Sequence, residues 1–88
     1  MTQKSIRFSQ HALLKFQVLA AHGLSLAKEL VLDVVLNPTK VVPGYGGRRI
    51  AQGSLDEGRV LRVVYEEQSS EIIIVTFYPG RRERYEKD

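Results

Sequence analysis

The sequence predicts a single-domain α+β fold over residues 1–88, with two N-terminal helices packed on one face of a mainly antiparallel sheet of three or four strands. Helical periodicity ends near Leu36, and from Thr39 the chain consists of β-prone runs separated by short turns. Short connections favour antiparallel pairing of consecutive strands. No linker is long enough to divide the chain into two domains.

The first segment predicts a short edge strand followed by a helix. The alternating run Lys4–Phe8 is typical of an edge strand. Ser9 is a suitable N-cap for a helix over Gln10–His22, because its hydroxyl can accept a hydrogen bond from the first helical turn. Gly23 then ends this helix.

A second helix is expected after a two-residue joint. Ser25 is its predicted N-cap, and Leu26–Leu36 has apolar residues at helical spacing. The helix should stop before Asn37 and Pro38, because the residue ahead of a proline avoids helical angles. The two helices together form a helical hairpin.

The extended half of the chain begins with two weaker strand signals. Val41 and Val42 indicate a strand, and the glycine-rich segment Pro43–Gly47 reads as a turn. This segment lacks the lysine and the following helix of a phosphate-binding loop. A further strand is predicted over Arg48–Leu55, and the turn Asp56–Gly58 leads into the next.

Two strongly β-prone runs, Arg59–Glu66 and Glu71–Tyr78, predict a hairpin that ends at a Pro79-Gly80 turn. The second run is almost wholly apolar, which predicts an interior strand covered on both faces. In the first run Arg62 lies between valines on one face. A buried guanidinium needs an anion, a carbonyl or water as its partner.

The composition excludes several classes of site. The chain has no cysteine, which rules out disulfides and thiolate metal sites. No run approaches the roughly 18 apolar residues of a membrane span, and the segment MTQKSIRFSQ lacks the apolar core of a signal peptide. We therefore expect a cytoplasmic protein that has no membrane partner and no cofactor.

The two histidines do not form a metal site. His11 and His22 lie on one helix, but about 16 Å apart along its axis. No carboxylate cluster accompanies either of them, so no metal is expected. His11 could serve as a general base, although a surface histidine explains it as well.

Arginines dominate the positive charge of a mildly basic chain of net charge +3. Six of them lie on or just after strands that antiparallel pairing brings side by side: Arg48, Arg49, Arg62, Arg81, Arg82 and Arg84. Planar guanidinium groups suit phosphates, and a tyrosine such as Tyr85 can stack on a base or transfer a proton. Cross-strand pairing with glutamates is the alternative explanation of the same arginines.

The segments FSQHALLKF, RRIAQG, LRVVYEE and VTFYPGRRERY, with a helix pair ending in NP, resemble a small, uncharacterised bacterial family. That family is grouped with the RelE/ParE superfamily of toxins, near the BrnT-type ribonuclease toxins. The resemblance covers nearly the whole chain and implies the RelE-like fold. It also implies the toxin of a type II toxin–antitoxin system, in which RelE-like members cleave RNA without a metal.

The resemblance assigns roles residue by residue. Arg62 matches the arginine of the LRVVY strand, Arg81 or Arg82 the basic residue after the last strand, and Tyr85 the C-terminal tyrosine. His11 matches an early histidine whose role the match does not define. Ribosome-dependent members carry more lysine and a clearer C-terminal helix than this chain.

The leading hypothesis is a metal-independent endoribonuclease acting on RNA, with mRNA, free or on the ribosome, as substrate and a cognate antitoxin as partner. Arg62, Arg82, Tyr85 and His11 are the expected catalytic residues. The expected RNA-binding residues are Arg48, Arg49, Arg81 and Arg84. The alternatives are a non-catalytic protein-binding module and a gyrase-targeting toxin, because ParE-type relatives share the fold.

Overall fold

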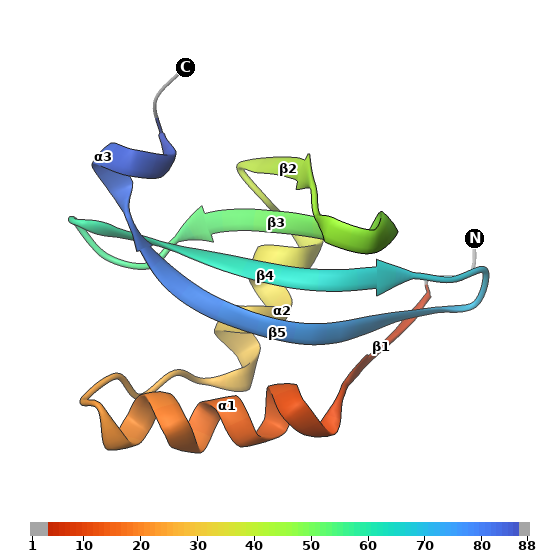
Figure 1. Ribbon diagram of the computed structural model, residues 1–88, viewed down its shortest axis with the longest axis horizontal. Coiled ribbons are helices and arrows are strands. Elements are labelled where there is room, and N and C mark those ends of the chain that lie inside the picture. The colour runs from red at the N-terminus through yellow and green to blue at the C-terminus, as the bar shows by residue number, and fades with distance from the viewer. Residues whose placement is uncertain (1–3, 87–88) are drawn as a thin grey trace.

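A computed structural model describes residues 4–86 and confirms a single-domain α+β fold (Figure 1). The elements in chain order are β1 (Ser5–Phe8), α1 (Gln10–Ala21), α2 (Lys28–Leu36), β2 (Lys40–Pro43), the 3-10 turn η1 (Tyr45–Gly47), β3 (Arg49–Ser54), β4 (Arg59–Glu67), β5 (Glu71–Arg81) and α3 (Arg82–Tyr85). The strands form one sheet in the order β1-β5-β4-β3-β2.

The sheet of the described chain has five strands rather than the predicted three or four. The two short runs at either edge, β1 and β2, both pair with a longer neighbour. β1 runs parallel to β5, whereas the other three pairs are antiparallel as predicted. The sheet is therefore mixed, with β4 at its centre.

The strand β5 is interior over its first half, as predicted, and longer than predicted. Residues Glu71–Ile74 lie between β1 and β4. The predicted Pro79-Gly80 turn is wrong, because both residues continue the pairing with β4, opposite Leu61 and Val60. A proline fits here because β1 has already ended, so no described strand on that side needs its N–H.

A β-bulge connects the sheet to α1. The β4–β5 register shifts between Val64 and Tyr65, which leaves Val75 without a partner in β4. The Ser9 hydroxyl donates to the Val75 carbonyl oxygen (2.9 Å) and accepts from the Ala12 N–H (3.0 Å). Ser9 is thus the N-cap of α1, as predicted, and also fixes the helix to the bulge.

The second helix begins two residues later than predicted. Ala27 rather than Ser25 is the N-cap of α2, and no side chain caps this helix. The joint is longer because the Leu24 N–H bonds the Leu19 carbonyl oxygen (2.8 Å), and Leu26 packs against the core from an extended segment. The chain needs these residues to pass from one helix to the other.

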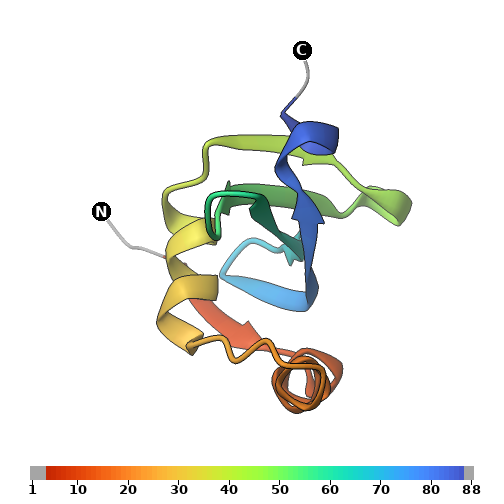
Figure 2. The same ribbon diagram turned by 90° about the vertical axis from the view of Figure 1, so that its left-hand side faces the viewer.

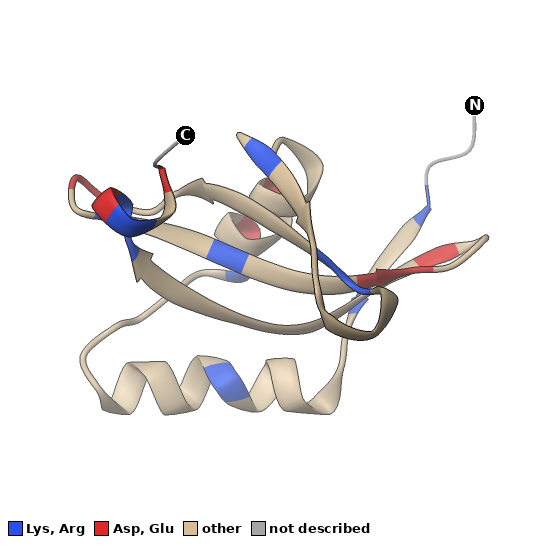
Figure 3. Ribbon diagram, turned by 45° about the horizontal axis from the view of Figure 1, so that its top comes forward, with Lys and Arg blue, Asp and Glu red and all other residues tan. Residues whose placement is uncertain are grey.

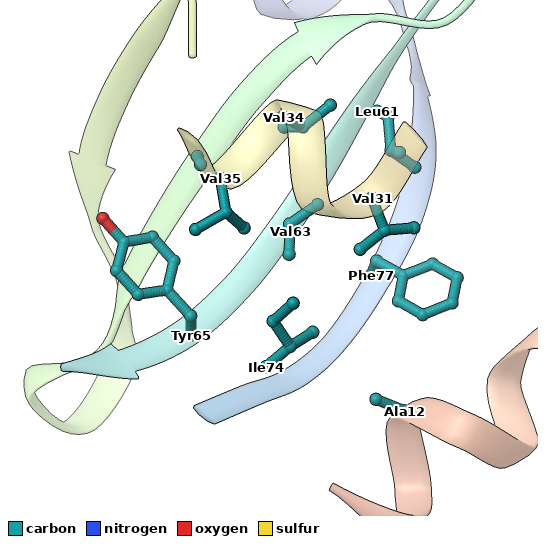
Figure 4. Close-up of a cluster of buried hydrophobic side chains, with 10 residues drawn as sticks. Ala12, Val31, Val34, Val35, Leu61, Val63, Tyr65, Ile74 and Phe77 are labelled. Carbon is teal, nitrogen blue, oxygen red and sulfur yellow. The ribbon is translucent and has the colours of Figure 1, made fainter. Parts of the chain in front are cut away.

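The hydrophobic core lies between the sheet and both helices (Figure 4). Phe77 of β5 is fully buried, and its ring centroid lies 4.6 Å from that of Phe16 on α1. The fully or almost fully buried apolar residues of this cluster include Ala12, Val31, Val34, Ala51, Leu61, Val63 and Ile74. Figures 1 and 2 show α1 and α2 on this side of the sheet, and α3 on the other. Burial of each large side chain contributes roughly 1.5–3 kcal/mol.

Gly53 permits the close packing of α2 on β3. A Cβ atom at Gly53 would lie 2.8 Å from Cγ2 of Val34. We predict that Gly53→Ala lowers the free energy of unfolding by about 1–3 kcal/mol, measured by urea denaturation. Gly58→Ala is the control, because a Cβ there meets nothing within 4 Å. Equal stabilities of the two variants would contradict the close approach.

Candidate functional site

Four polar side chains from four strands form one row across the sheet. Lys40, Gln52, Arg62 and Tyr78 are successive register partners in β2, β3, β4 and β5. Arg62 alternates with Leu61 and Val63, which belong to the core, so this row lies on the opposite face. We call it the polar row, and we call the side of the sheet turned away from α1 and α2 the open face.

Arg62 is a buried cation with neutral partners. Its side chain is only 8% exposed. Its Nε donates to the Tyr78 hydroxyl oxygen (3.1 Å) and its Nη1 to Oε1 of Gln52 (2.5 Å). Within residues 4–86 it forms no ion pair with a carboxylate. Because burying a charge without a counter-ion is costly, this position favours an anion nearby.

Tyr85 covers this cation. The guanidinium carbon of Arg62 lies 4.1 Å from the centroid of the Tyr85 ring, a cation–π contact. The Tyr85 carbonyl oxygen accepts hydrogen bonds from Nζ of Lys40 (2.6 Å) and Nε2 of Gln52 (3.3 Å). The short helix α3 is therefore docked on the polar row through its last residue.

Gly80 provides the space for the Tyr85 ring. A Cβ atom at Gly80 would overlap ring atoms Cε2 and Cδ2 of Tyr85. Arg84 lies on the outer side of the same segment, exposed, with its guanidinium carbon 5.6 Å from the ring centroid. Tyr85 thus brings together two of the predicted site arginines, Arg62 and Arg84.

Arg82 has a different environment from Arg62. Its backbone N–H donates to the Gly58 carbonyl oxygen (2.9 Å) in the β3–β4 turn. Its guanidinium binds the same turn and its own helix through Glu57 O (3.0 Å), Asp56 O (2.6 Å), Arg59 O (3.3 Å), Ser54 Oγ (2.8 Å) and Glu86 Oε2 (2.8 Å). These bonds occupy its donors, so Arg82 fastens α3 to the turn.

The turn that Arg82 holds is itself well defined. The Asp56 carboxylate accepts from Nε (2.9 Å) and Nη2 (2.7 Å) of Arg59 and from the Gly58 N–H (3.1 Å). Hydrogen bonding to Arg59 is the main cause that lowers the pKa of Asp56 below its usual value. The carboxylate therefore stays charged at neutral pH and keeps the turn in place.

Arg81 lies at the same end of the sheet but is exposed to solvent. It faces Arg59 across the β4–β5 pair and lines a shallow hollow of about 710 Å³ together with Glu57, Glu83 and Glu86. No hydrogen bond or ion pair of its side chain occurs within residues 4–86. Figure 3 shows that basic and acidic residues alternate here, so the hollow is not uniformly basic.

Arg48 and Arg49 lie at the far end of β3 from α3. Nε of Arg48 forms an ion pair with Glu66 (2.9 Å). Strand alternation places Arg48 on the open face and Arg49 on the helix side, opposite Tyr65. Only Arg48 of this pair therefore shares a face with the polar row.

His11 is separated from the other predicted site residues. It is exposed on the first turn of α1, on the helix-covered side of the sheet (Figure 1). The sheet lies between His11 and the polar row, so the two cannot act on the same bond. The position of His11 in the sequence did not show on which face of the sheet it would lie.

Three members of the polar row and the glycine beside it were not predicted from the sequence. Gln52 and Tyr78 flank Arg62, Lys40 binds the Tyr85 carbonyl oxygen, and Gly80 lies against the Tyr85 ring. The partner of Arg62 on β3 could have been found by counting outward from the Asp56–Gly58 turn. The partner on β5 could not, because the bulge changes the count.

Two negative observations apply to the part of the chain that is described. No three His, Cys, Asp or Glu side chains gather where they could hold a metal ion. Between Lys4 and Glu86 no helix has the length and apolarity needed to cross a bilayer. Comparison of the chain with protein-family models, curated proteins and solved structures finds no match.

The geometry predicts that two neighbouring arginines differ in how much they contribute to the free energy of unfolding. Arg82→Ala should lower the free energy of unfolding by about 1–3 kcal/mol, because three carbonyl oxygens and the Ser54 hydroxyl lose a charged donor that holds α3 to the turn. Arg81→Ala should change it by less than about 0.5 kcal/mol, because that side chain is exposed. Chemical denaturation of both variants measures the difference. Similar losses for both would refute the fastening role of Arg82.

Proposed function

We propose that the chain is a metal-independent endoribonuclease, the toxin of a type II toxin–antitoxin pair with a RelE-like arrangement. The observation that carries this proposal is the buried Arg62 cation, held by neutral groups directly beneath Tyr85. A phosphodiester next to this tyrosine would supply the negative charge that the polar row lacks. The resemblance of the LRVVYEE and VTFYPGRRERY segments to RelE/ParE-type toxins supports the same reading.

The arrangement suggests separate roles for the residues around Tyr85. Attack of a ribose 2′-hydroxyl on the adjacent phosphorus forms a cyclic phosphate and releases the 5′-oxygen of the next nucleotide. One group must accept the proton of the 2′-hydroxyl and another must protonate the leaving oxygen. Tyr85 is the group placed to protonate the leaving 5′-oxygen, with water accepting the proton of the 2′-hydroxyl, and the exposed Arg84 is placed to contact the phosphate.

Arg62 acts in this proposal through position and charge. It lies under the Tyr85 ring and fixes its location, while its charge favours the extra negative charge of the transition state. Lys40 and Gln52 hold the Tyr85 carbonyl oxygen and so define where the ring sits. Arg82 supports the same segment from the β3–β4 turn, and His11 takes no part.

A non-catalytic binding module is the second candidate, and one surface favours it. Leu13, Leu14 and Val18 of α1 are 41%, 57% and 44% exposed, which is unusual for large apolar side chains on one helix. A gyrase-directed toxin would share this fold, too.

Induced expression of the protein separates the three candidates. Growth arrest with degraded mRNA favours the ribonuclease, and growth arrest without loss of mRNA favours the gyrase-directed toxin. Unaffected growth favours the binding module.

The ribonuclease proposal predicts activity that survives metal removal. Purified protein should cleave single-stranded RNA equally with EDTA or with magnesium. Tyr85→Phe and Arg62→Met should each lower the rate by roughly a hundred- to thousandfold. Arg62→Met should leave the free energy of unfolding within about 1 kcal/mol, because removal of a buried charge without a counter-ion offsets the hydrogen bonds lost to Gln52 and Tyr78.

A gel assay of labelled RNA and thermal melts of the same samples measure both properties. Arg81→Ala is the matched control, an exposed arginine outside the polar row, and should lose far less activity. Cleavage that EDTA abolishes and magnesium restores would sink the mechanism. So would a large loss of melting temperature in Arg62→Met with the residual folded protein still active.

The proposal also predicts a protein partner encoded nearby. An antitoxin would bind the open face with an acidic or amphipathic segment that folds on binding. Co-expression of the product of the neighbouring gene should give a stable complex in size-exclusion chromatography at moderate salt. Two separately eluting proteins would remove the toxin–antitoxin part of the proposal, and RNA cleavage by the free chain would still be open to test.

A further inference from the structure

Tyr45 is an aromatic residue held entirely outside the fold. Its side chain is 95% exposed, far more than any other large apolar residue of the described chain. The turn that carries it has a defined backbone, with Gly46 and Gly47 at positive φ (68° and 81°). The Gly44 N–H donates to the Arg48 carbonyl oxygen (2.7 Å), and the Arg48 N–H to the Tyr45 carbonyl oxygen (3.3 Å). The ring is therefore displayed by an ordered turn.

The surroundings of this ring suit an anionic, planar ligand. Beside the turn is a hollow of about 360 Å³, whose lining includes Val42, Pro43, Arg48 and Arg49. Arg48 uses only Nε for its ion pair with Glu66, and its two Nη nitrogens make no hydrogen bond within residues 4–86. The side chain of Arg49 makes no hydrogen bond or ion pair there either. The exposed Tyr45 and the free Nη nitrogens of Arg48 thus lie three residues apart on one turn beside an apolar hollow.

This turn lies on the same side of the sheet as α3. Figure 2 shows the segment 44–47 projecting from the sheet on the side opposite α2, the side on which α3 lies. Arg48 and Gln52 share the open face of β3 and are four residues apart, which is roughly 13 Å along a strand. The half-buried Ile50 and Val64 lie between them. A strand of RNA could cross this stretch from the turn to Tyr85.

We propose that Tyr45 and Arg48 form a second nucleotide subsite for single-stranded RNA, a few nucleotides away from the phosphate at Tyr85. A base stacks on the Tyr45 ring and a neighbouring phosphate binds Arg48. This inference rests on the proposed function and specifies its substrate as single-stranded. In a duplex the base faces are covered by their neighbours, so an exposed ring on a turn can stack only on an unpaired base.

An exposed tyrosine can also anchor a protein partner. The two Nη nitrogens of Arg48, which have no partner within the described residues, favour a phosphate-bearing ligand instead. Stacking of one base on an aromatic ring contributes about 1–3 kcal/mol to binding. Loss of the ring should therefore weaken binding by roughly 5- to 150-fold.

The test is fluorescence anisotropy with labelled RNA whose reactive 2′-hydroxyls are methylated, so that it is not cleaved. Tyr45→Ala should bind an oligonucleotide of about eight nucleotides 5- to 150-fold more weakly than the wild type. Tyr45→Phe, which keeps the ring, should bind within about twofold. A dinucleotide, too short to span both subsites, should bind all three proteins equally.

Several results of these binding measurements would overturn the proposed subsite. Unchanged affinity of Tyr45→Ala for the long RNA overturns the subsite, while loss of binding in Arg84→Ala would leave the proposed function standing. Equal competition by duplex RNA overturns the single-strand assignment. If the wild type binds no RNA, both proposals fall. Unchanged RNA affinity with weaker antitoxin binding assigns Tyr45 to a protein interface. Thermal melts should match the wild type, because Tyr45 is 95% exposed.

Discussion

The buried charge of Arg62 is the constraint on which the open face depends. A guanidinium that is 8% exposed must satisfy its donors locally, and it does so with Gln52 on one neighbouring strand and Tyr78 on the other. The same charge holds the Tyr85 ring that covers it. One side chain therefore connects three strands to the C-terminal segment, and the short α3 has a fixed place although it buries no residue of its own.

The bulge at Val75 decides which residue meets Arg62. Pairing outward from Glu67 and Ile72 without a shift would set Phe77 opposite Arg62, an apolar ring against a cation. The extra residue moves the register by one, so that Tyr78 faces Arg62 and Phe77 faces Val63 in the core. The bulge thereby places the Tyr78 side chain on the open face and the Phe77 ring in the core. Ser9 stabilises the bulge through the Val75 carbonyl oxygen.

Local patterns in the sequence were sufficient to predict most helices and strands but not to predict the arrangement of the candidate site. Alternation around Arg62 and the serine before α1 predicted a two-faced strand and a capped helix, because each depends on neighbours in the chain. The extension of β5 through Pro79 depended on where β1 ends, which no local pattern shows. The role of Arg82 depended on carbonyl oxygens about 25 residues earlier in the chain. The six arginines that the sequence predicted side by side therefore differ in environment: Arg62 is buried, Arg82 fastens α3, and the others are partly or fully exposed.

Pro79 has a further consequence for how molecules meet one another in solution. Past Ile74, β5 is left without a described neighbour on its outer side, and such a strand can recruit a strand from another molecule. Continuous edge-to-edge pairing needs a regular series of N–H donors, and proline interrupts that series. The irregular backbone at Val75 interrupts it a second time. Val75 and Pro79 thus also disfavour edge-to-edge association of several molecules into extended sheets at high concentration.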